Sequence, residues 1–170
     1  MSIAIVFGTR PEAIKLAPII WSLQKDTSLH FHLIWSGQHY DYELSRIFFE
    51  ELKLPDPSYD LEVGSGTHGQ QTARIIERLE EVILKEKPAV IVAQGDTNTV
   101  LGAALVAAKC KIPFAHVEAG LRSYDRTMPE EINRIVADAV AELCFAPTER
   151  AALNLLYEGI FPQKLSLIHI

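Results

Sequence analysis

Cysteine is scarce in this sequence, which contains only Cys110 and Cys144, far apart and outside any Cys-X-X-Cys pair. A small disulfide-stapled fold needs several closely spaced cysteines, and so does a structural zinc site. We therefore expect two reduced thiols that are buried as small apolar side chains in a cytoplasmic protein. A disulfide between the two residues is the alternative.

Positive charge is also in short supply, with 16 Lys and Arg against 22 Asp and Glu and a net charge of −6. Surfaces that bind nucleic acid or anionic membranes are normally basic, so we expect neither partner. No apolar run approaches the roughly 20 residues of a membrane-spanning helix, and no leader-like segment opens the sequence. These features predict a cytoplasmic protein whose partner is a small molecule.

Apolar residues make up 48% of the 170-residue chain, which fits one ordinary globular domain. Strands that are buried in a parallel sheet appear as short, almost continuous apolar runs. Five segments have this pattern and are predicted to be strands: residues 3–7, 31–35, 89–94, 112–117 and 142–146.

Helical patterns lie between and after these runs. In QQTARIIERLEEVILKEK, Ile75, Leu79 and Ile83 recur at helical spacing, and Pro88 ends the helix because it cannot continue one. The predicted helices are residues 11–25, 41–52, 69–87, 97–110, 130–141 and 148–158. Alternating strands and helices imply right-handed crossovers, so the predicted fold is α/β, a Rossmann-like doubly wound parallel sheet.

Polar loops follow each predicted strand. They are GTRPEA (8–13), SGQH (36–39), GDTNT (95–99), EAGLR (118–122) and PTE (147–149). In open parallel sheets, ligands bind beyond the carboxyl ends of the strands, so these loops are the expected site. The charged stretch HVEAGLRSYDRTMPEEINR is then the fourth strand's end, its loop and the start of the next helix.

The first loop is a candidate anion site. Pro11 suits the first turn of a helix, whose amide groups, with Arg10 and Lys15, would favour a phosphate group. The alternative is a tight turn with solvated charges. Neither a Gly-X-Gly-X-X-Gly fingerprint nor a P-loop lysine motif is present, so no dinucleotide or P-loop site is predicted.

Four carboxylates fall in two neighbouring loops: Asp96, Glu118, Glu130 and Glu131. If they converge, mutual repulsion raises the pKa of at least one and suits it to proton transfer. The alternatives are that Asp96 caps the following helix and that Glu130 and Glu131 interact with a helix dipole. At most one of the adjacent pair is expected to face the site.

The histidines do not suggest a metal site. His39, His68 and His116 lack the spacing of metal ligands and have no accompanying cysteine cluster. His116 lies inside an apolar run, so we interpret it as a hydrogen-bonded core residue. We predict that no metal is bound.

Several long motifs occur in a fixed order: FGTRPEAIKLAPI, SGQH, QGDTNTVLGAALVAA and HVEAGLRSYDRTMPEEINRIVADAVAELCFAPTE. Together, from residue 3 to about 164, they resemble the N-terminal half of the non-hydrolysing UDP-N-acetylglucosamine 2-epimerases. The resemblance implies a GT-B-like enzyme of two Rossmann-like domains with the active site between them. It also implies a homodimer of the full-length enzyme, UDP-N-acetylglucosamine and UDP as ligands, and no redox cofactor.

The family's reaction inverts carbon 2 of the sugar by eliminating UDP to 2-acetamidoglucal and adding it back. By resemblance, the acidic catalytic residues are Asp96, Glu118 and Glu130, with Glu131 as the alternative to Glu130. The resemblance also implies substrate-binding residues, with the first two near the diphosphate: Arg10, Lys15, His39 and Arg122.

Family members are about twice as long as this chain. We therefore expect residues 1–164 to be the N-terminal domain, with a C-terminal nucleotide-binding domain missing. Codons that can encode residues 165–170, LSLIHI, match a common sequencing adapter, so we expect this segment to be a non-native tail; a natural edge strand is the alternative. Two further functional alternatives are a hydrolysing 2-epimerase and an inactive sugar-nucleotide-binding module.

Overall fold

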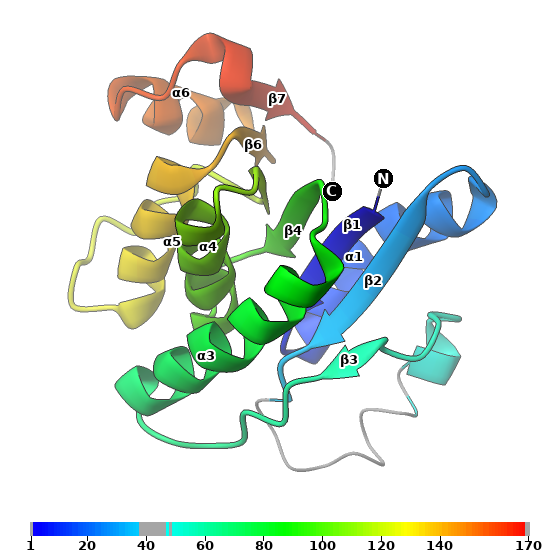
Figure 1. Cartoon of the computed structure of the whole chain (residues 1–170). Helices are drawn as coiled ribbons and strands as arrows, with labels where there is room; N and C mark the ends of the chain where they lie inside the picture. Colours follow the sequence, from blue (N-terminus) through cyan, green and yellow to red (C-terminus); the bar gives the residue numbers. More distant parts are fainter. Residues whose placement is uncertain (1, 38–46, 48, 169–170) are drawn as a thin grey trace.

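The computed structural model describes residues 2–37, 47 and 49–168. Its centre is a parallel sheet of seven strands in the order β3-β2-β1-β4-β5-β6-β7 (Figure 1). The strands are β1 Ser2–Phe7, β2 His30–Trp35, β3 Tyr59–Asp60, β4 Val90–Gln94, β5 Phe114–Val117, β6 Leu143–Ala146 and β7 Leu165–Leu167. This order, which reverses direction between β1 and β4, is that of a doubly wound Rossmann-like sheet and confirms the predicted fold class.

Helices connect the strands and cover both faces of the sheet. They are α1 Arg10–Lys25, α3 His68–Glu86, α4 Asn98–Cys110, α5 Pro129–Val140 and α6 Glu149–Tyr157, followed by a 3-10 turn at Pro162–Lys164. Threonine side chains cap the N-termini of three of them, with Thr67 at α3, Thr97 at α4 and Thr148 at α6. Such caps satisfy amide groups that have no partner inside the helix.

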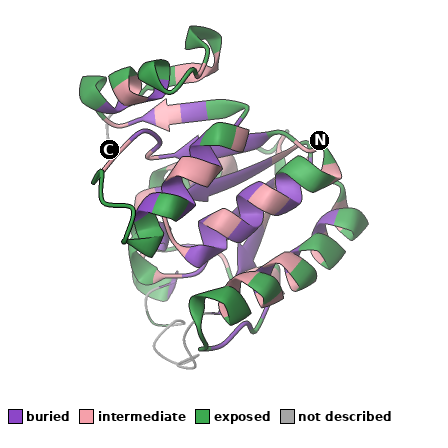
Figure 2. Ribbon diagram, turned by 90° about the vertical axis from the view of Figure 1, so that its left-hand side faces the viewer, coloured by how far each residue is buried: buried purple, intermediate pink, exposed green. Residues whose placement is uncertain are grey.

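Two hydrophobic cores lie on opposite faces of the sheet. Successive residues of β1 alternate between them, with Val6 in the core under α3 to α6 and Phe7 in the core under α1. Buried residues, purple in Figure 2, accordingly occupy the sheet and the inward sides of the helices. Burial on both faces explains why the strands read as continuous apolar runs rather than alternating ones.

The predicted elements mostly agree with the structure. All five predicted strands are present, and five of the six predicted helices match within about two residues. The helix predicted at 41–52 lies largely outside the described residues. The prediction of only five strands is wrong, because β3 has two residues, too few to produce a recognisable pattern, and β7 extends the sheet beside β6. The origin of the segment that contains β7 stays a prediction.

The two cysteines differ in their surroundings. Both are free thiols, and Cys144 is buried in the sheet, where burial is the main cause that raises its pKa to about 12. Cys110 is only partly buried, so the expectation that both are core residues is wrong for this one, which lies at the C-terminal end of α4. In the part of the chain that the structure describes, no helix is long and apolar enough to cross a membrane.

Candidate active site

The carboxyl ends of β1, β4 and β5 lie side by side, because β4 pairs in parallel with both of the others. The loops that follow them therefore meet at one edge of the sheet. Lys15 of α1 contacts Glu118 after β5, and Glu12 of α1 accepts a hydrogen bond from Thr97 after β4. The polar residues that follow these strands are brought together, as the sequence predicts.

Glu118 forms an ion pair at this edge. Lys15 Nζ lies 2.8 Å and 3.0 Å from its two carboxylate oxygens, and the Gln94 side-chain amide donates to one of them. Only 13% of the Glu118 side chain is exposed, against 38% for Lys15. Glu118 also has a φ of +69°, a left-handed conformation that non-glycine residues seldom adopt and that often accompanies function.

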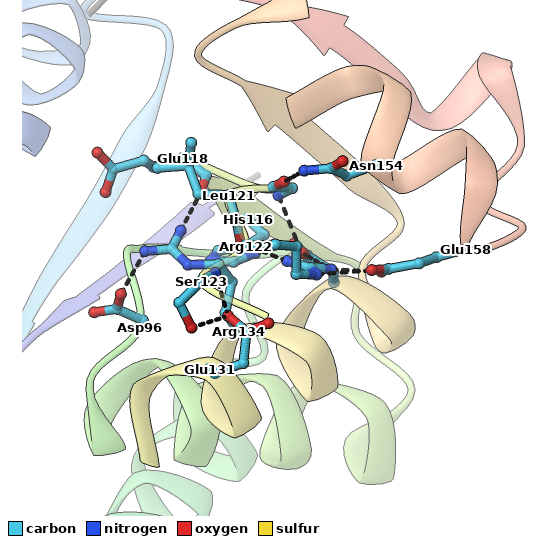
Figure 3. Close-up of polar contacts among 12 residues, drawn as sticks. Asp96, His116, Glu118, Leu121, Arg122, Ser123, Glu131, Arg134, Asn154 and Glu158 are labelled. Atoms are coloured by element: carbon cyan, nitrogen blue, oxygen red, sulfur yellow. Dashed lines mark hydrogen bonds and ion pairs between the residues drawn. The ribbon is translucent and has the colours of Figure 1, made fainter. Parts of the chain in front are cut away.

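Asp96 and Glu118 are bridged by Arg134, a residue that the sequence did not single out. Its guanidinium donates to the Asp96 carboxylate and to the Glu118 carbonyl oxygen (Figure 3). Arg134 is only 6% exposed although it comes from the helix α5. The sequence does show Arg134 one helical turn after Glu130, on the same side of the predicted helix. The inward orientation of the Arg134 side chain, however, depends on packing.

The adjacent glutamates of α5 have different surroundings. The two carboxylate oxygens of Glu131 accept hydrogen bonds from the Ser123 amide at 2.9 Å, the Ser123 hydroxyl at 3.0 Å and the Tyr124 amide at 3.1 Å. Glu131 is 5% exposed, whereas Glu130 is exposed. Both line a pocket of about 250 Å³ together with Asp96.

Three of these carboxylates have partners of their own. Asp96 faces Arg134, Glu118 faces Lys15, and Glu131 faces donors of its own loop. Each negative charge is therefore compensated by its own partner. Tertiary structure provides these partners, since Lys15 is 103 residues from Glu118 and Arg134 is 38 residues from Asp96.

The predicted anion site at the start of α1 is already occupied in part by a side chain of the helix itself. Glu12 is 2% exposed and accepts hydrogen bonds from the Gly8 amide at 3.0 Å and the Thr97 hydroxyl at 2.8 Å. Burial raises the pKa of Glu12, and the hydrogen bonds from Thr9, Thr97 and Gly8 oppose that rise. The Gly8 amide therefore binds a carboxylate of the chain, while phosphate binding by Arg10 and Lys15 stays a prediction.

Arg10 and Arg122, both predicted to bind substrate, are placed differently. The Arg10 side chain is 63% exposed, 3.5 Å from Glu51. The Arg122 side chain is 1% exposed, and its guanidinium lies 2.7 Å from Asp138 and 2.5 Å from Glu158. Burial opposes the charge on Arg122, but the two carboxylates outweigh it and raise its pKa. Their substrate contacts stay predictions.

The histidines that the sequence singled out have different surroundings. His116 is fully buried and hydrogen-bonded, which confirms its interpretation as a core residue. His68 lies at the start of α3, where its Nδ1 contacts Asn98, and His39 lies outside the described residues. Among the residues that the structure describes, no three His, Cys, Asp or Glu side chains are grouped to hold a metal ion.

Gly120 packs so closely in the loop after β5 that alanine is expected to lower the free energy of unfolding by about 3 kcal/mol or more. Its φ is +80°, and an added Cβ would lie 2.2 Å from the Ala151 carbonyl oxygen. Urea denaturation would measure the loss. Gly159→Ala is the matched control, because its φ is +87° with no heavy atom within 4 Å of the added carbon. Equal losses in the two variants would contradict the packing argument.

Comparison with known proteins gives a consistent picture. The profile of the UDP-N-acetylglucosamine 2-epimerase family matches residues 22–168. A UDP-N-acetylglucosamine 2-epimerase from Methanocaldococcus jannaschii is 57% identical over 168 residues, which are 99% of this chain and 46% of the relative. A UDP-2,3-diacetamido-2,3-dideoxy-D-glucuronate 2-epimerase from Pseudomonas aeruginosa is 43% identical over 170 residues, 100% of this chain and 48% of the relative.

A solved structure supports the same similarity. The crystal structure of the Methanocaldococcus jannaschii UDP-GlcNAc 2-epimerase in complex with UDP-GlcNAc and UDP superposes with a TM-score of 0.96 and 56% sequence identity. The match covers 99% of this chain and 46% of that one. The chain thus spans about half the length of the relatives that it matches.

Proposed function

Because the chain belongs to the UDP-N-acetylglucosamine 2-epimerase family, we propose that it forms the carboxylate-bearing half of a non-hydrolysing 2-epimerase. The whole enzyme interconverts UDP-N-acetylglucosamine and UDP-N-acetylmannosamine. The observation that carries the proposal is the edge where Lys15, Glu118, Asp96 and Arg134 meet, on a fold that superposes on a relative in complex with UDP-GlcNAc and UDP.

The reaction needs two kinds of chemical group. Removing the proton at carbon 2 and returning one to the opposite face requires positioned acids and bases, and the departing diphosphate requires compensating positive charge. Asp96, Glu118 and Glu130 supply the first kind. Lys15, which lies beside Glu118, and the exposed Arg10 supply the second.

The surroundings of the two adjacent glutamates favour Glu130 as the catalytic one. Glu131 uses both carboxylate oxygens to hold the loop at Ser123 and Tyr124, so its hydrogen-bonding capacity is committed. Glu130 lines the same pocket and is exposed. A catalytic acid or base must reach the substrate, and in this pair only Glu130 is unburied.

The proposal assigns residues 1–164 to an N-terminal domain and the other side of the cleft to a C-terminal nucleotide-binding domain. The support is that the relatives are about twice as long as the match. Catalysis by elimination depends on holding the sugar and the diphosphate together, so the isolated chain is expected to show no significant turnover. The whole enzyme is proposed to be a cytoplasmic homodimer.

The test uses the full-length gene product, obtained by amplifying the locus past codon 164, and UDP-N-acetylglucosamine in deuterated water. We expect UDP-N-acetylmannosamine to appear with deuterium at carbon 2, because the proton removed exchanges with solvent before return. Proton NMR follows both events in one sample. The 170-residue chain, assayed in parallel, is expected to be inactive.

Other outcomes have distinct meanings. Free N-acetylmannosamine together with UDP would identify a hydrolysing enzyme. The absence of both product and deuterium exchange would overturn the proposal in favour of a binding module. UDP-2,3-diacetamido-2,3-dideoxy-D-glucuronate is the comparison substrate, because the Pseudomonas aeruginosa relative that is named for it is 43% identical. Faster turnover of that sugar would reassign the substrate but retain the 2-epimerase chemistry.

A further inference from the structure

A buried histidine and aspartate lie directly behind the candidate site, and the proposed reaction has not used them. His116 of β5 and Asp138 of α5 are 0% and 1% exposed, with 2.5 Å between Nδ1 and Oδ1. Polar pairs in such surroundings are costly unless every group is satisfied. In the described residues, no buried side-chain nitrogen or oxygen lacks a partner, so this pair is fully satisfied.

The partners of the ring determine where its protons are. His116 Nε2 lies 2.7 Å from the Gly95 carbonyl oxygen, which only accepts hydrogen bonds, so Nε2 carries a proton. Nδ1 faces Asp138, whose second oxygen accepts from the Gly120 amide at 3.0 Å and forms an ion pair with Arg122 at 2.7 Å.

Asp138 is ionised. Burial opposes the charge on Asp138, but His116 and Arg122 outweigh burial and lower its pKa. An ionised carboxylate only accepts hydrogen bonds, so Nδ1 of His116 faces an acceptor as Nε2 does. Both nitrogens of the ring therefore face acceptors, the Gly95 carbonyl oxygen and the Asp138 carboxylate.

This pair joins the two turns that carry candidate catalytic carboxylates. Gly95, held by Nε2, directly precedes Asp96, and Gly120, held by Asp138, follows Glu118 by two residues. Both turns contain left-handed backbone, with φ of +90° at Gly95 and +69° at Glu118. Surrounding contacts must maintain such conformations, because little in the local sequence favours them at Glu118.

We propose that His116 is protonated on both ring nitrogens, and that His116 and the Asp138 carboxylate are positioning residues that fix Asp96 and Glu118 in their reactive arrangement. The inference rests on the proposed epimerase function. Neither residue touches the pocket itself, so they act through the backbone of the two turns. A neutral ring would serve only one of its two acceptors as a donor, which is why the charge matters.

The first test concerns the protonation state and needs no activity. Nitrogen-15 NMR of the selectively histidine-labelled 170-residue chain is expected to show two protonated ring nitrogens for His116 at pH 8. In Asp138→Asn, the new amide can donate to Nδ1, and one nitrogen is expected to become unprotonated. A single protonated nitrogen in the unsubstituted chain would overturn the proposal, even if the variant does not fold.

The second test concerns positioning, in the full-length gene product. Asp138→Asn is expected to lower kcat about 10- to 100-fold and to leave KM within about twofold, because small displacements of catalytic groups slow the chemistry more than binding. Asp26→Asn, at the exposed C-terminus of α1, is the matched control and is expected to retain kcat.

The outcomes separate this inference from the proposed function. An inactive unsubstituted enzyme would contradict the proposed function, while the nitrogen signals would still decide the protonation state. An active enzyme whose kcat is unchanged by Asp138→Asn would overturn the positioning role alone. The variant could also lose kcat and thermal stability together and recover its kcat when assayed at low temperature. That result would indicate a merely structural role and would also overturn the positioning role.

Discussion

Glu118→Gln is expected to lower kcat for epimerisation about 10³-fold in the full-length enzyme, because an amide cannot transfer the proton that a positioned carboxylate transfers. Lys15 loses its ionic partner but is 38% exposed, so the free energy of unfolding should fall by no more than about 1 kcal/mol. Deuterium exchange at carbon 2 and thermal denaturation measure the two effects separately.

Glu142→Gln is a matched control for this variant. It removes the same charge from an ion pair, 3.0 Å from Lys164, at an exposed position away from the site. Its kcat is expected to match that of the unsubstituted enzyme. A Glu118→Gln enzyme with normal exchange and turnover would show that Glu118 only anchors Lys15 and Gln94.

Glu130→Gln and Glu131→Gln are expected to affect different properties, kcat for the first and stability for the second, although the two residues are adjacent. Glu130 is exposed, so Glu130→Gln should lower kcat about 100-fold and leave stability unchanged within about 0.5 kcal/mol. Glu131 accepts from three donors, so Glu131→Gln should cost about 1–3 kcal/mol of unfolding free energy. Urea denaturation and initial-rate assays of both variants measure the contrast.

Each variant serves as the other's control, since the chemical change is identical. A large kcat loss in a folded Glu131→Gln enzyme, with Glu130→Gln fully active, would reverse the assignment. It would mean that the loop at Ser123 and Tyr124 releases Glu131 when substrate binds. Equal kcat losses in both, at a temperature where both are folded, would contradict the division of roles.

The fold could be predicted well from the sequence because its strands are buried on both faces. A run such as IAIVF has apolar residues on successive positions, and Val6 and Phe7 enter different cores. That pattern has few explanations other than a strand in a sheet covered on both sides. β3 escaped prediction because two residues carry no periodicity, and its pairing with β2 depends on the rest of the sheet.

The candidate site could be located from the sequence but not described in detail. Loops after parallel strands meet at one edge, so the strand pattern alone was enough to place Asp96 and Glu118 together. Their partners could not be predicted. The ion pairs of Lys15 with Glu118 and of Arg122 with Asp138 join residues far apart in sequence, and Arg134 was not singled out.

The sequence by itself determined the fold class, the family and the edge of the sheet where the chemistry is expected. Strand and helix patterns, turn residues and motif order are local properties, and local properties can be read along the chain. Only the tertiary structure decided that Glu131 is buried while Glu130 is exposed, that Glu12 accepts from the Gly8 amide, and that both ring nitrogens of His116 face acceptors. These features depend on side chains far apart in sequence that meet only when the sheet has formed, and their charges are balanced by those contacts rather than by neighbours in the chain.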